Sequence, residues 1–290
     1  MAGIPGKAAP GAHEIWFGLM HTDEYLLGHS SGEVERLQAQ AHFIEPITRR
    51  IFREAGIVPG MRVLEIGSGA GDVAFLAADM IGTTGEVVGV DRVSAAVETA
   101  RARAVGRALR HVSFQSGDPA EMSFDRPFDA VIGRYVLQFQ KQPALMLRKL
   151  ARHAKSGGLV VFHELDWNGL SSFPPVPTFD RCCRWGLETL RRHGTETRMG
   201  SKLHATFVEA GLSAPSMRLE ALLGGGMNGA AVLRLMADLT ATLLPEMQRL
   251  GIATAHEVDI DTLFDRMTRE SAAGASLLIG HFQIGAWSRV

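Results

Sequence analysis

Cysteine is nearly absent from this sequence of 290 residues, which contains only the adjacent pair Cys182 and Cys183. Adjacent cysteines do not easily meet disulfide geometry, so we interpret both as structural thiols on a helix and expect a cytoplasmic protein. No Cys/His spacing typical of a metal site occurs, and we therefore expect no bound metal.

The sequence also lacks an excess of charge, since 30 basic and 31 acidic residues give a formal net charge of -1. It has no basic stripe with interleaved aromatic residues, so we expect no nucleic-acid partner. No apolar run approaches the roughly 20 residues of a membrane helix, so we expect no membrane partner. The first 12 residues carry no hydrophobic segment for a signal peptide, and we predict a disordered tail there.

What the sequence does contain is a repeated alternation of short apolar runs and helical segments. Such units predict a parallel sheet with helices on both faces. We therefore predict an α/β fold, a Rossmann-like three-layer sandwich with a helical cap and a mostly parallel seven-stranded sheet whose last strand is antiparallel. The expected strands are residues 62–66, 86–91, 111–115, 128–132, 158–163, 217–223 and 276–290.

A glycine-rich loop follows the first expected strand. Gly67, Gly69 and Gly71 allow a sharp turn and a close approach of backbone to ligand. Their spacing differs from the Gly-x-Gly-x-x-Gly of dinucleotide-binding loops, and Asp72 would repel a pyrophosphate. Glu65 favours a cationic ligand instead.

This loop resembles motif I of the class I S-adenosylmethionine-dependent methyltransferases, and the resemblance extends over about residues 58–165. It implies S-adenosylmethionine as cofactor, with Asp91 binding the ribose hydroxyls and Asp118 the adenine amino group. The alternatives are a helix cap at Asp91 and a simple Asp-Pro turn at Asp118. The expected cofactor contacts in this core are Glu65, Gly67, Ser68, Gly69, Gly71, Asp91, Arg92, Gly117, Asp118, Pro119, Arg134 and Tyr135.

We expect a single domain over residues 13–290, in which the cofactor-binding core spans 58–165 and the final strand 276–290. Residues 13–57 look like the helical lid of small-molecule methyltransferases, which implies that Tyr25 and Arg36 reach the cofactor carboxylate. The alternative is that the aromatic residues of this segment only attach the helix to the body. Helical insertions are expected to form the cap, at residues 166–199 and 224–275.

The acceptor is expected beyond the carboxyl ends of the strands. The fifth strand directs His163 and Glu164 there, and either side chain could take a proton from a nucleophile. Successive side chains of a strand point to opposite faces of the sheet, so we do not expect both residues to act on the acceptor. We expect Glu164 to be the catalytic group and keep His163 as the alternative. The expected substrate contacts are Trp16, Phe17, Met20, Gln138, Phe139, Trp167 and Trp185.

The sequence thus predicts an enzyme that methylates carbon, nitrogen or oxygen of a small, largely apolar metabolite, as in secondary metabolism. Alignment and dehydration of the nucleophile would supply most of the catalysis. Two alternatives keep the cofactor, namely a cyclisation without methyl transfer and a non-catalytic cofactor-binding protein. Nicotinamide-dependent reduction is disfavoured by the glycine spacing. The expected partner is a small-molecule substrate, and homodimerisation stays open.

Overall fold

The structure is a computed structural model that describes residues 31–225 and 229–290, with the side chains of residues 31–42 left undescribed. The expected lid and substrate residues Trp16, Phe17, Met20 and Tyr25 lie outside this range. The same holds for the side chain of Arg36, although its backbone belongs to the first described helix.

A single sheet of eight strands runs through the molecule in the order β3-β2-β1-β4-β5-β8-β6, and β7 pairs with β8 as well. The strands β1 to β5 are mutually parallel, and β8 is antiparallel to its neighbours. The strands are β1 Arg62–Ile66, β2 Glu86–Asp91, β3 Val112–Ser116, β4 Phe128–Arg134, β5 Ala154–Asp166, β6 Ser171–Phe173, β7 Ser216–Gly224 and β8 Leu277–Arg289.

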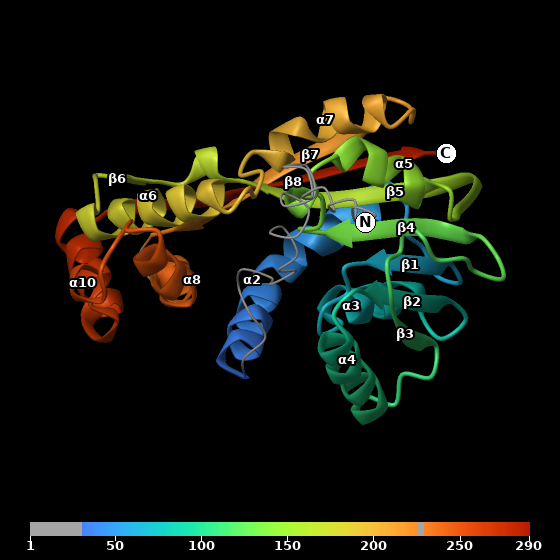
Figure 1. The fold of residues 1–290 in the computed structure, drawn as a ribbon, viewed down its shortest axis with the longest axis horizontal. Helices are drawn as coiled ribbons and strands as arrows, with labels where there is room; N and C mark the ends of the chain where they lie inside the picture. Colours follow the sequence, from blue (N-terminus) through green and yellow to red (C-terminus); the bar gives the residue numbers. More distant parts are fainter. Residues whose placement is uncertain (1–30, 226–228) are drawn as a thin grey trace, which may run out of the picture.

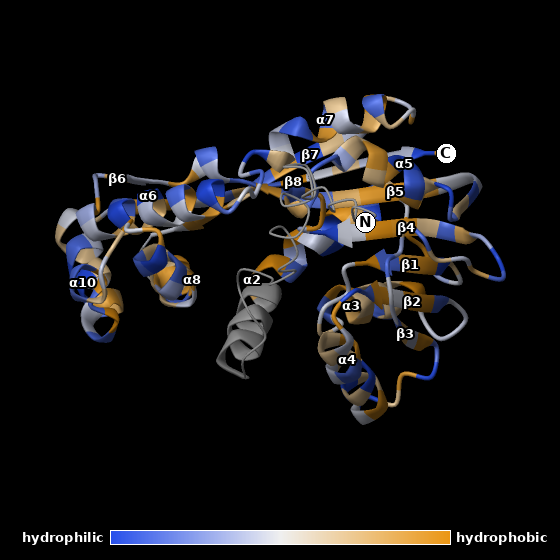
Figure 2. Ribbon diagram, viewed as in Figure 1, coloured by the Kyte–Doolittle hydropathy of each residue, from blue (hydrophilic) through white to orange (hydrophobic). Residues whose placement is uncertain are grey.

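Helices cover both faces of the parallel strands, which confirms the predicted three-layer sandwich (Figure 1). Burial on both faces explains why the middle of β4 is a continuous apolar run, Ala130, Val131 and Ile132, and why β4 is mostly hydrophobic in Figure 2. The helices are α2 Ser31–Ala55, α3 Asp72–Ile81, α4 Ser94–Gly106, α5 Pro143–Ala151, α6 Pro177–Arg192, α7 Met199–Glu209, α8 Gly229–Arg249, α9 Ala255–Val258 and α10 Ile260–Gly274.

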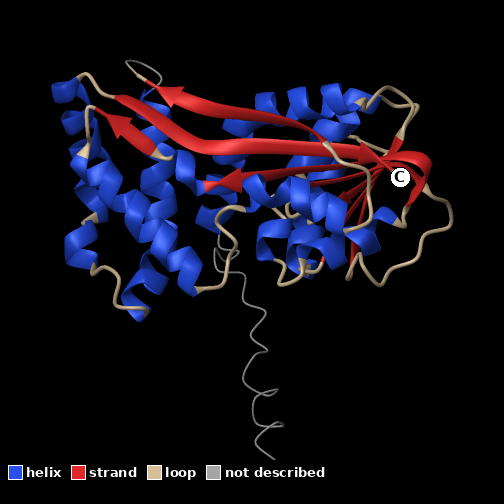
Figure 3. Cartoon of the chain, turned by 90° about the horizontal axis from the view of Figure 1, so that it is seen from above, coloured by secondary structure: helices blue, strands red, loops and turns tan. Residues whose placement is uncertain are grey.

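The number of strands differs from the prediction because β6 adds an eighth. This strand has three residues, and Ser171 pairs with Ile279 while Phe173 pairs with Leu277. A segment this short and this exposed shows no period-2 pattern that a sequence could reveal. Its pairing partner β8 is long enough to continue from the core, beside β5, into the region of the cap (Figure 3).

The cap has a hydrophobic core of its own, formed by α6, α8 and α10. Helix α6 buries Phe179, Cys182, Gly186 and Leu190, which recur at steps of three and four and so form one apolar face. Helix α7, by contrast, packs against α5, β5 and β8 and belongs to the main domain. The cap therefore adjoins the carboxyl end of β5, at the side of the sheet where a ligand is expected.

Candidate functional site

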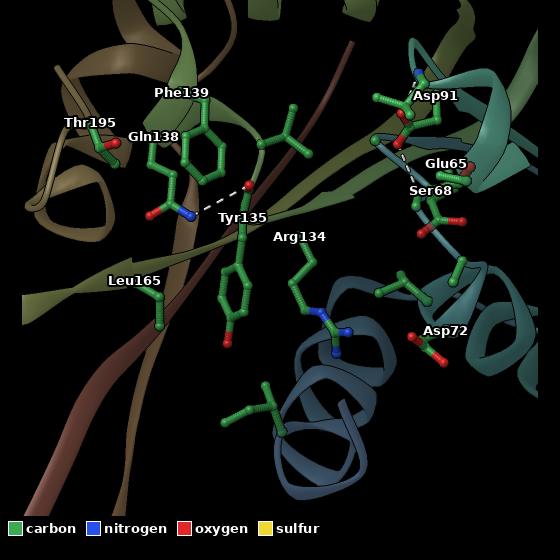
Figure 4. Close-up of a pocket in the computed structure, with 18 of the residues that line it drawn as sticks. Glu65, Ser68, Asp72, Asp91, Arg134, Tyr135, Gln138, Phe139, Leu165 and Thr195 are labelled. Atoms are coloured by element: carbon green, nitrogen blue, oxygen red, sulfur yellow. Dashed lines mark hydrogen bonds between the residues drawn. The ribbon is translucent and has the colours of Figure 1, made fainter. Parts of the chain in front are cut away.

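A cavity of about 380 Å³ lies at the carboxyl ends of the parallel strands. It is lined by the glycine loop after β1, by the ends of β2, β4 and β5, and by residues of the cap. Figure 4 shows Glu65 and Asp91 on one side of the cavity and Gln138, Leu165 and Thr195 on the other. The size suits a ligand of a few hundred daltons, and the position is the usual one in open parallel sheets.

The glycine loop turns sharply because its backbone amides bond back to the sheet. The amide groups of Gly67 and Ser68 donate to the carbonyl oxygen of Val90, at 2.8 and 3.0 Å. Gly67 has a φ of +67°, and a Cβ there would lie 2.8 Å from the Val136 side chain. Glycine is required at this position for both its φ and its packing. The turn brings Gly67, Ser68 and Gly69 into the cavity lining.

Gly71 lies at the closely packed start of α3. It precedes α3 with a φ of +91°, and a Cβ there would lie 2.9 Å from Phe114 and 3.0 Å from Phe75. The residue is absent from the described cavity lining. Gly71 therefore permits close packing of the helix start, and its expected contact with the cofactor stays a prediction.

Asp91 ends β2 with its carboxylate fixed at the cavity wall. One carboxylate oxygen accepts from the amide of Gly69 at 2.8 Å, and the other accepts from the amide of Val93 at 2.9 Å. Each oxygen keeps a lone pair for a further donor. Val93, and not Asp91, is the N-cap residue of α4. The arrangement presents two oriented acceptors, the geometry that a vicinal diol needs.

Glu65 is a buried carboxylate, 1% exposed, whose Oε2 atom has no hydrogen-bond partner among the described residues. Burial raises its pKa well above the usual value, and the nearby Arg134 guanidinium opposes that shift. Asp72 also lines the cavity, but its carboxylate is paired with Arg103 at 2.7 Å. An unpartnered buried acceptor such as Glu65 calls for a donor from a ligand.

Arg134 and Tyr135 stand at the end of β4 and line the cavity as expected. Tyr135 adopts a φ of +59°, an uncommon conformation for a residue with a side chain. Its hydroxyl donates to the Gln283 side chain at 2.5 Å, and burial raises its pKa. Arg134 donates to the hydroxyl of Thr48 on α2 at 3.3 Å. A hydrogen bond to another side chain thus fixes the position of each of the two.

The structure places the two expected catalytic groups, His163 and Glu164, outside the described cavity lining and leaves both fully buried. Glu164 accepts from the amides of Val136 and Leu137 at 2.9 and 2.7 Å, and burial raises its pKa to about 7. These bonds anchor the turn after β4. The arrangement argues against direct proton transfer by Glu164, because Oε1 accepts from both of these amides and Oε2 accepts from the amide of Gln138 at 3.4 Å.

His163 faces the opposite side of β5. Its Nδ1 atom lies 3.2 Å from the Thr48 hydroxyl, and its Nε2 atom lies 2.9 Å from the Gln283 side-chain oxygen. Burial, together with the charge of Arg134, lowers its pKa to about 3, so the ring is neutral. Each residue satisfies hydrogen bonds inside the protein, and neither reaches the cavity.

The acceptor side of the cavity includes the expected residues Gln138, Phe139 and Trp167. Trp185 is an exception, because it packs against the core of the cap with the Arg181 guanidinium 5.6 Å from its ring. Several further lining residues carry no local sequence signal, since their positions depend on how the cap and β8 meet the core. They are Ile44, Leu165, Leu190, Thr195, Leu239 and His281.

The loop after β3 was expected to reach the adenine, but Arg92, Gly117, Asp118 and Pro119 are absent from the described cavity lining. Asp118 is paired with Arg92 at 2.8 Å and accepts from the amide of Ala120, so local contacts occupy its carboxylate. The cavity wall in this region comes from the start of α4, whose small side chains leave room for a ring. These residues are Val93, Ala95, Ala96 and Thr99.

Among the described side chains, those of residues 43–225 and 229–290, no group of three or more His, Cys, Asp or Glu is arranged to hold a metal ion. Among the helices of this same part of the chain, none is long and apolar enough to span a bilayer.

The middle part of this chain is similar to known methyltransferases. Residues 57–199 match a family model described as a methyltransferase domain. Aklanonic acid methyltransferase DauC from Streptomyces sp. (strain C5) is 35% identical over 134 residues, which cover 46% of this chain and 60% of the relative. Nocamycin O-methyltransferase from Saccharothrix syringae is 32% identical over 190 residues, covering 65% of this chain and 61% of the relative. The chain thus spans about three fifths of the length of these curated relatives.

Among solved structures, the YcgJ protein from Bacillus subtilis superposes with a TM-score of 0.53 at 19% identity, covering 86% of this chain and 99% of that protein. At this identity the likeness concerns the fold, and it agrees with the α/β architecture predicted from the sequence.

Proposed function

We propose that this protein transfers a methyl group from S-adenosylmethionine to a small, largely apolar metabolite, a proposal supported by the match of residues 57–199 to a methyltransferase-domain family model. Asp91 carries the proposal, because its carboxylate is fixed at the cavity wall by the amides of Gly69 and Val93. No other described lining carboxylate has both oxygens oriented by backbone amides in this way.

The residues at this end of the cavity fit S-adenosylmethionine. Asp91 can accept from the two ribose hydroxyls, each bond to a charged group being worth about 1.5–3 kcal/mol. The unpartnered Oε2 atom of Glu65 can accept from the ammonium group of the cofactor. The Arg134 guanidinium, whose charge acts on Glu65, lies between Tyr135 and Asp72 in Figure 4 and can pair with the cofactor carboxylate. The small residues of α4 leave space for the adenine.

When bound, the cofactor supplies an electrophilic methyl group on a positively charged sulfur. The residues of this chain contribute position and dehydration, because the reaction is an in-line displacement. Val136 and Gln138 hold the cavity wall after β4, and Glu164 fixes that turn through the amides of Val136 and Leu137. Leu190 and Leu239 bring apolar cap surface to the acceptor side. A nucleophile in this space would lose most of its water.

The apolar acceptor side favours a small, hydrophobic substrate over a polymer. Two relatives are named for small-molecule methylation, one for aklanonic acid and one for nocamycin O-methylation, and we extend that substrate class to this chain as part of the proposal. Both cysteines are free thiols, which suits the reducing cytoplasm that we propose as its location.

Isothermal titration calorimetry tests the cofactor assignment with S-adenosylmethionine and with NAD as titrants. We expect saturable binding of S-adenosylmethionine and none of NAD. Asp91→Asn replaces one of the two accepting oxygens, so its affinity for S-adenosylmethionine should fall by about 10- to 100-fold. Asp125→Asn is the control, because Asp125 is exposed and pairs with Arg62 away from the cavity.

Three outcomes would contradict the proposal. The first is unchanged affinity in Asp91→Asn, provided that thermal unfolding shows a folded variant. The second is product formation from a candidate acceptor without S-adenosylhomocysteine, which would favour cyclisation on the same cofactor. The third is binding of S-adenosylmethionine with no reaction for any acceptor, which would favour the non-catalytic alternative.

A further inference from the structure

The acceptor side of the cavity contains two buried polar atoms that have no hydrogen-bond partner among the described residues. They are the Nε2 atom of His281 and the Oγ1 atom of Thr195. Their neighbours in the lining are mostly apolar, and include Leu165, Leu190 and Leu239. Buried polar groups are nearly always paired in folded proteins, so two unpaired atoms in one ligand cavity point to a polar group on the ligand.

His281 is held in a defined orientation. It precedes Phe282 of β8, which pairs with Asp166 at the end of β5. Its ring packs edge-on against Trp167, with centroids 4.4 Å apart and an interplanar angle of 80°. The amide of Trp167 in turn donates to the carbonyl of Thr197, two residues beyond Thr195. Trp167 therefore joins the segments that carry the two unpaired atoms.

The other ionisable side chains of the described lining are already engaged or lie at the cofactor end. Asp72 pairs with Arg103, and Asp91 accepts from two amides. The Tyr135 hydroxyl donates to Gln283, and Glu65 lies near Arg134. On the acceptor side of the described lining, His281 is therefore the remaining side chain that can act as a base. Burial lowers its pKa to about 4, so the ring is neutral near pH 7 and one ring nitrogen keeps a free lone pair.

We propose that His281 accepts the proton of an aromatic hydroxyl group on the methyl acceptor, while Thr195 bonds to a second oxygen of acceptors that have one. This inference rests on the proposed function and specifies that the methyl group is transferred to an oxygen atom of the acceptor. Aromatic character follows from the Phe139 and Trp167 rings in the lining.

In the proposed step, the hydroxyl proton passes to the free ring nitrogen of His281, and the oxygen forms a bond to the methyl carbon. The carbon–sulfur bond breaks, and sulfur keeps its electron pair as a neutral thioether. The imidazolium then releases its proton to solvent after the product leaves.

The test compares 1-naphthol with 1-methoxynaphthalene, which has the same ring but no hydroxyl proton. Calorimetry on the protein saturated with S-adenosylhomocysteine should show about tenfold tighter binding of 1-naphthol to the wild type, the value of one hydrogen bond. His281→Leu should abolish this preference and leave affinity for S-adenosylhomocysteine unchanged.

A second variant separates proton transfer from binding. His281→Gln keeps a hydrogen-bond acceptor, so the preference for 1-naphthol should persist. Its methylation of 1-naphthol, followed as S-adenosylhomocysteine formed, should fall by about 10²- to 10⁴-fold because glutamine takes up no proton. The matched control is His111→Gln, since His111 also has an unpaired buried Nε2 atom but is absent from the described cavity lining. We expect it to behave as the wild type.

Three results would overturn the inference. In the first, the wild type binds 1-naphthol no better than 1-methoxynaphthalene, or binds it without methylating it. In the second, the preference survives in His281→Leu. In the third, His281→Gln methylates 1-naphthol at the wild-type rate. A protein that binds S-adenosylmethionine through Asp91 yet gives one of these results fails this inference alone, whereas loss of cofactor binding would refute the proposed function itself.

Discussion

Tyr135 and His163 share one hydrogen-bond acceptor, because both the Tyr135 hydroxyl, at 2.5 Å, and the His163 Nε2 atom, at 2.9 Å, lie against the side-chain oxygen of Gln283. Since that oxygen only accepts, His163 carries its proton on Nε2 and accepts from the Thr48 hydroxyl on Nδ1. Arg134 donates to the same Thr48 hydroxyl. One buried chain of bonds therefore fixes two cavity-lining side chains and links them to helix α2.

Removing the shared acceptor should lower the free energy of unfolding by more than removing one of its two donors. Tyr135→Phe deletes a single hydrogen bond and should lower the free energy of unfolding by about 1 kcal/mol. Gln283→Leu leaves the Tyr135 hydroxyl and the His163 N–H unpaired and should lower it by about 2–5 kcal/mol. Urea denaturation measures both values. Gln115→Leu is the control, because Gln115 is exposed on β3 and should change stability little. If Tyr135→Phe and Gln283→Leu lowered the free energy of unfolding by the same amount, the two donors would not depend on one acceptor.

Glu164 offers a direct test of anchoring against catalysis. Glu164→Gln keeps the oxygen that accepts from Val136 and Leu137, so methylation of 1-naphthol should stay within a few-fold of the wild type. Glu164→Ala leaves those buried amides unpaired and should lower the free energy of unfolding by about 2–5 kcal/mol. Chemical denaturation and the S-adenosylhomocysteine assay give the two readouts. If Glu164→Gln is stable but methylates 1-naphthol about 10²-fold more slowly than the wild type, Glu164 and not an anchoring role would account for the proton transfer.

The sequence predicted the sheet and the glycine loop well because both depend on local patterns. Apolar runs mark the strands. The glycine spacing at Gly67 and Gly69, together with Asp91 at the end of the next strand, marks the cofactor end of the cavity. It predicted the fifth strand too, but a strand pattern reveals only that His163 and Glu164 face opposite ways. Which buried partners each side chain meets depends on α2 and on the turn after β4.

The acceptor side was harder to predict because its residues come from segments far apart in the sequence. Leu190 and Leu239 belong to cap helices, and their apolar positions look like ordinary helix core. His281 lies within β8, where a single histidine in an alternating strand carries no distinctive motif. The packing of Trp185 was hard to predict for the same reason, since the helical pattern of α6 does not show which residues meet the cap core and which line the cavity.

Acidification tests the buried state of His163. Its pKa is lowered to about 3 in the fold from 6.5, so between these pH values the unfolded chain binds a proton that the native protein does not. The free energy of unfolding therefore falls as the pH falls from 6.5 toward 3, by up to about 1.4 kcal/mol per pH unit for this group. His281, whose pKa is lowered to about 4, contributes in the same direction.

The variant His163→Gln removes the contribution of His163 and keeps that of His281. The difference in free energy of unfolding between wild type and variant should therefore narrow by about 2 kcal/mol between pH 7 and pH 5. Urea titrations at both pH values measure this difference, and a difference that is independent of pH would mean that native His163 takes up its proton as readily as the unfolded chain does.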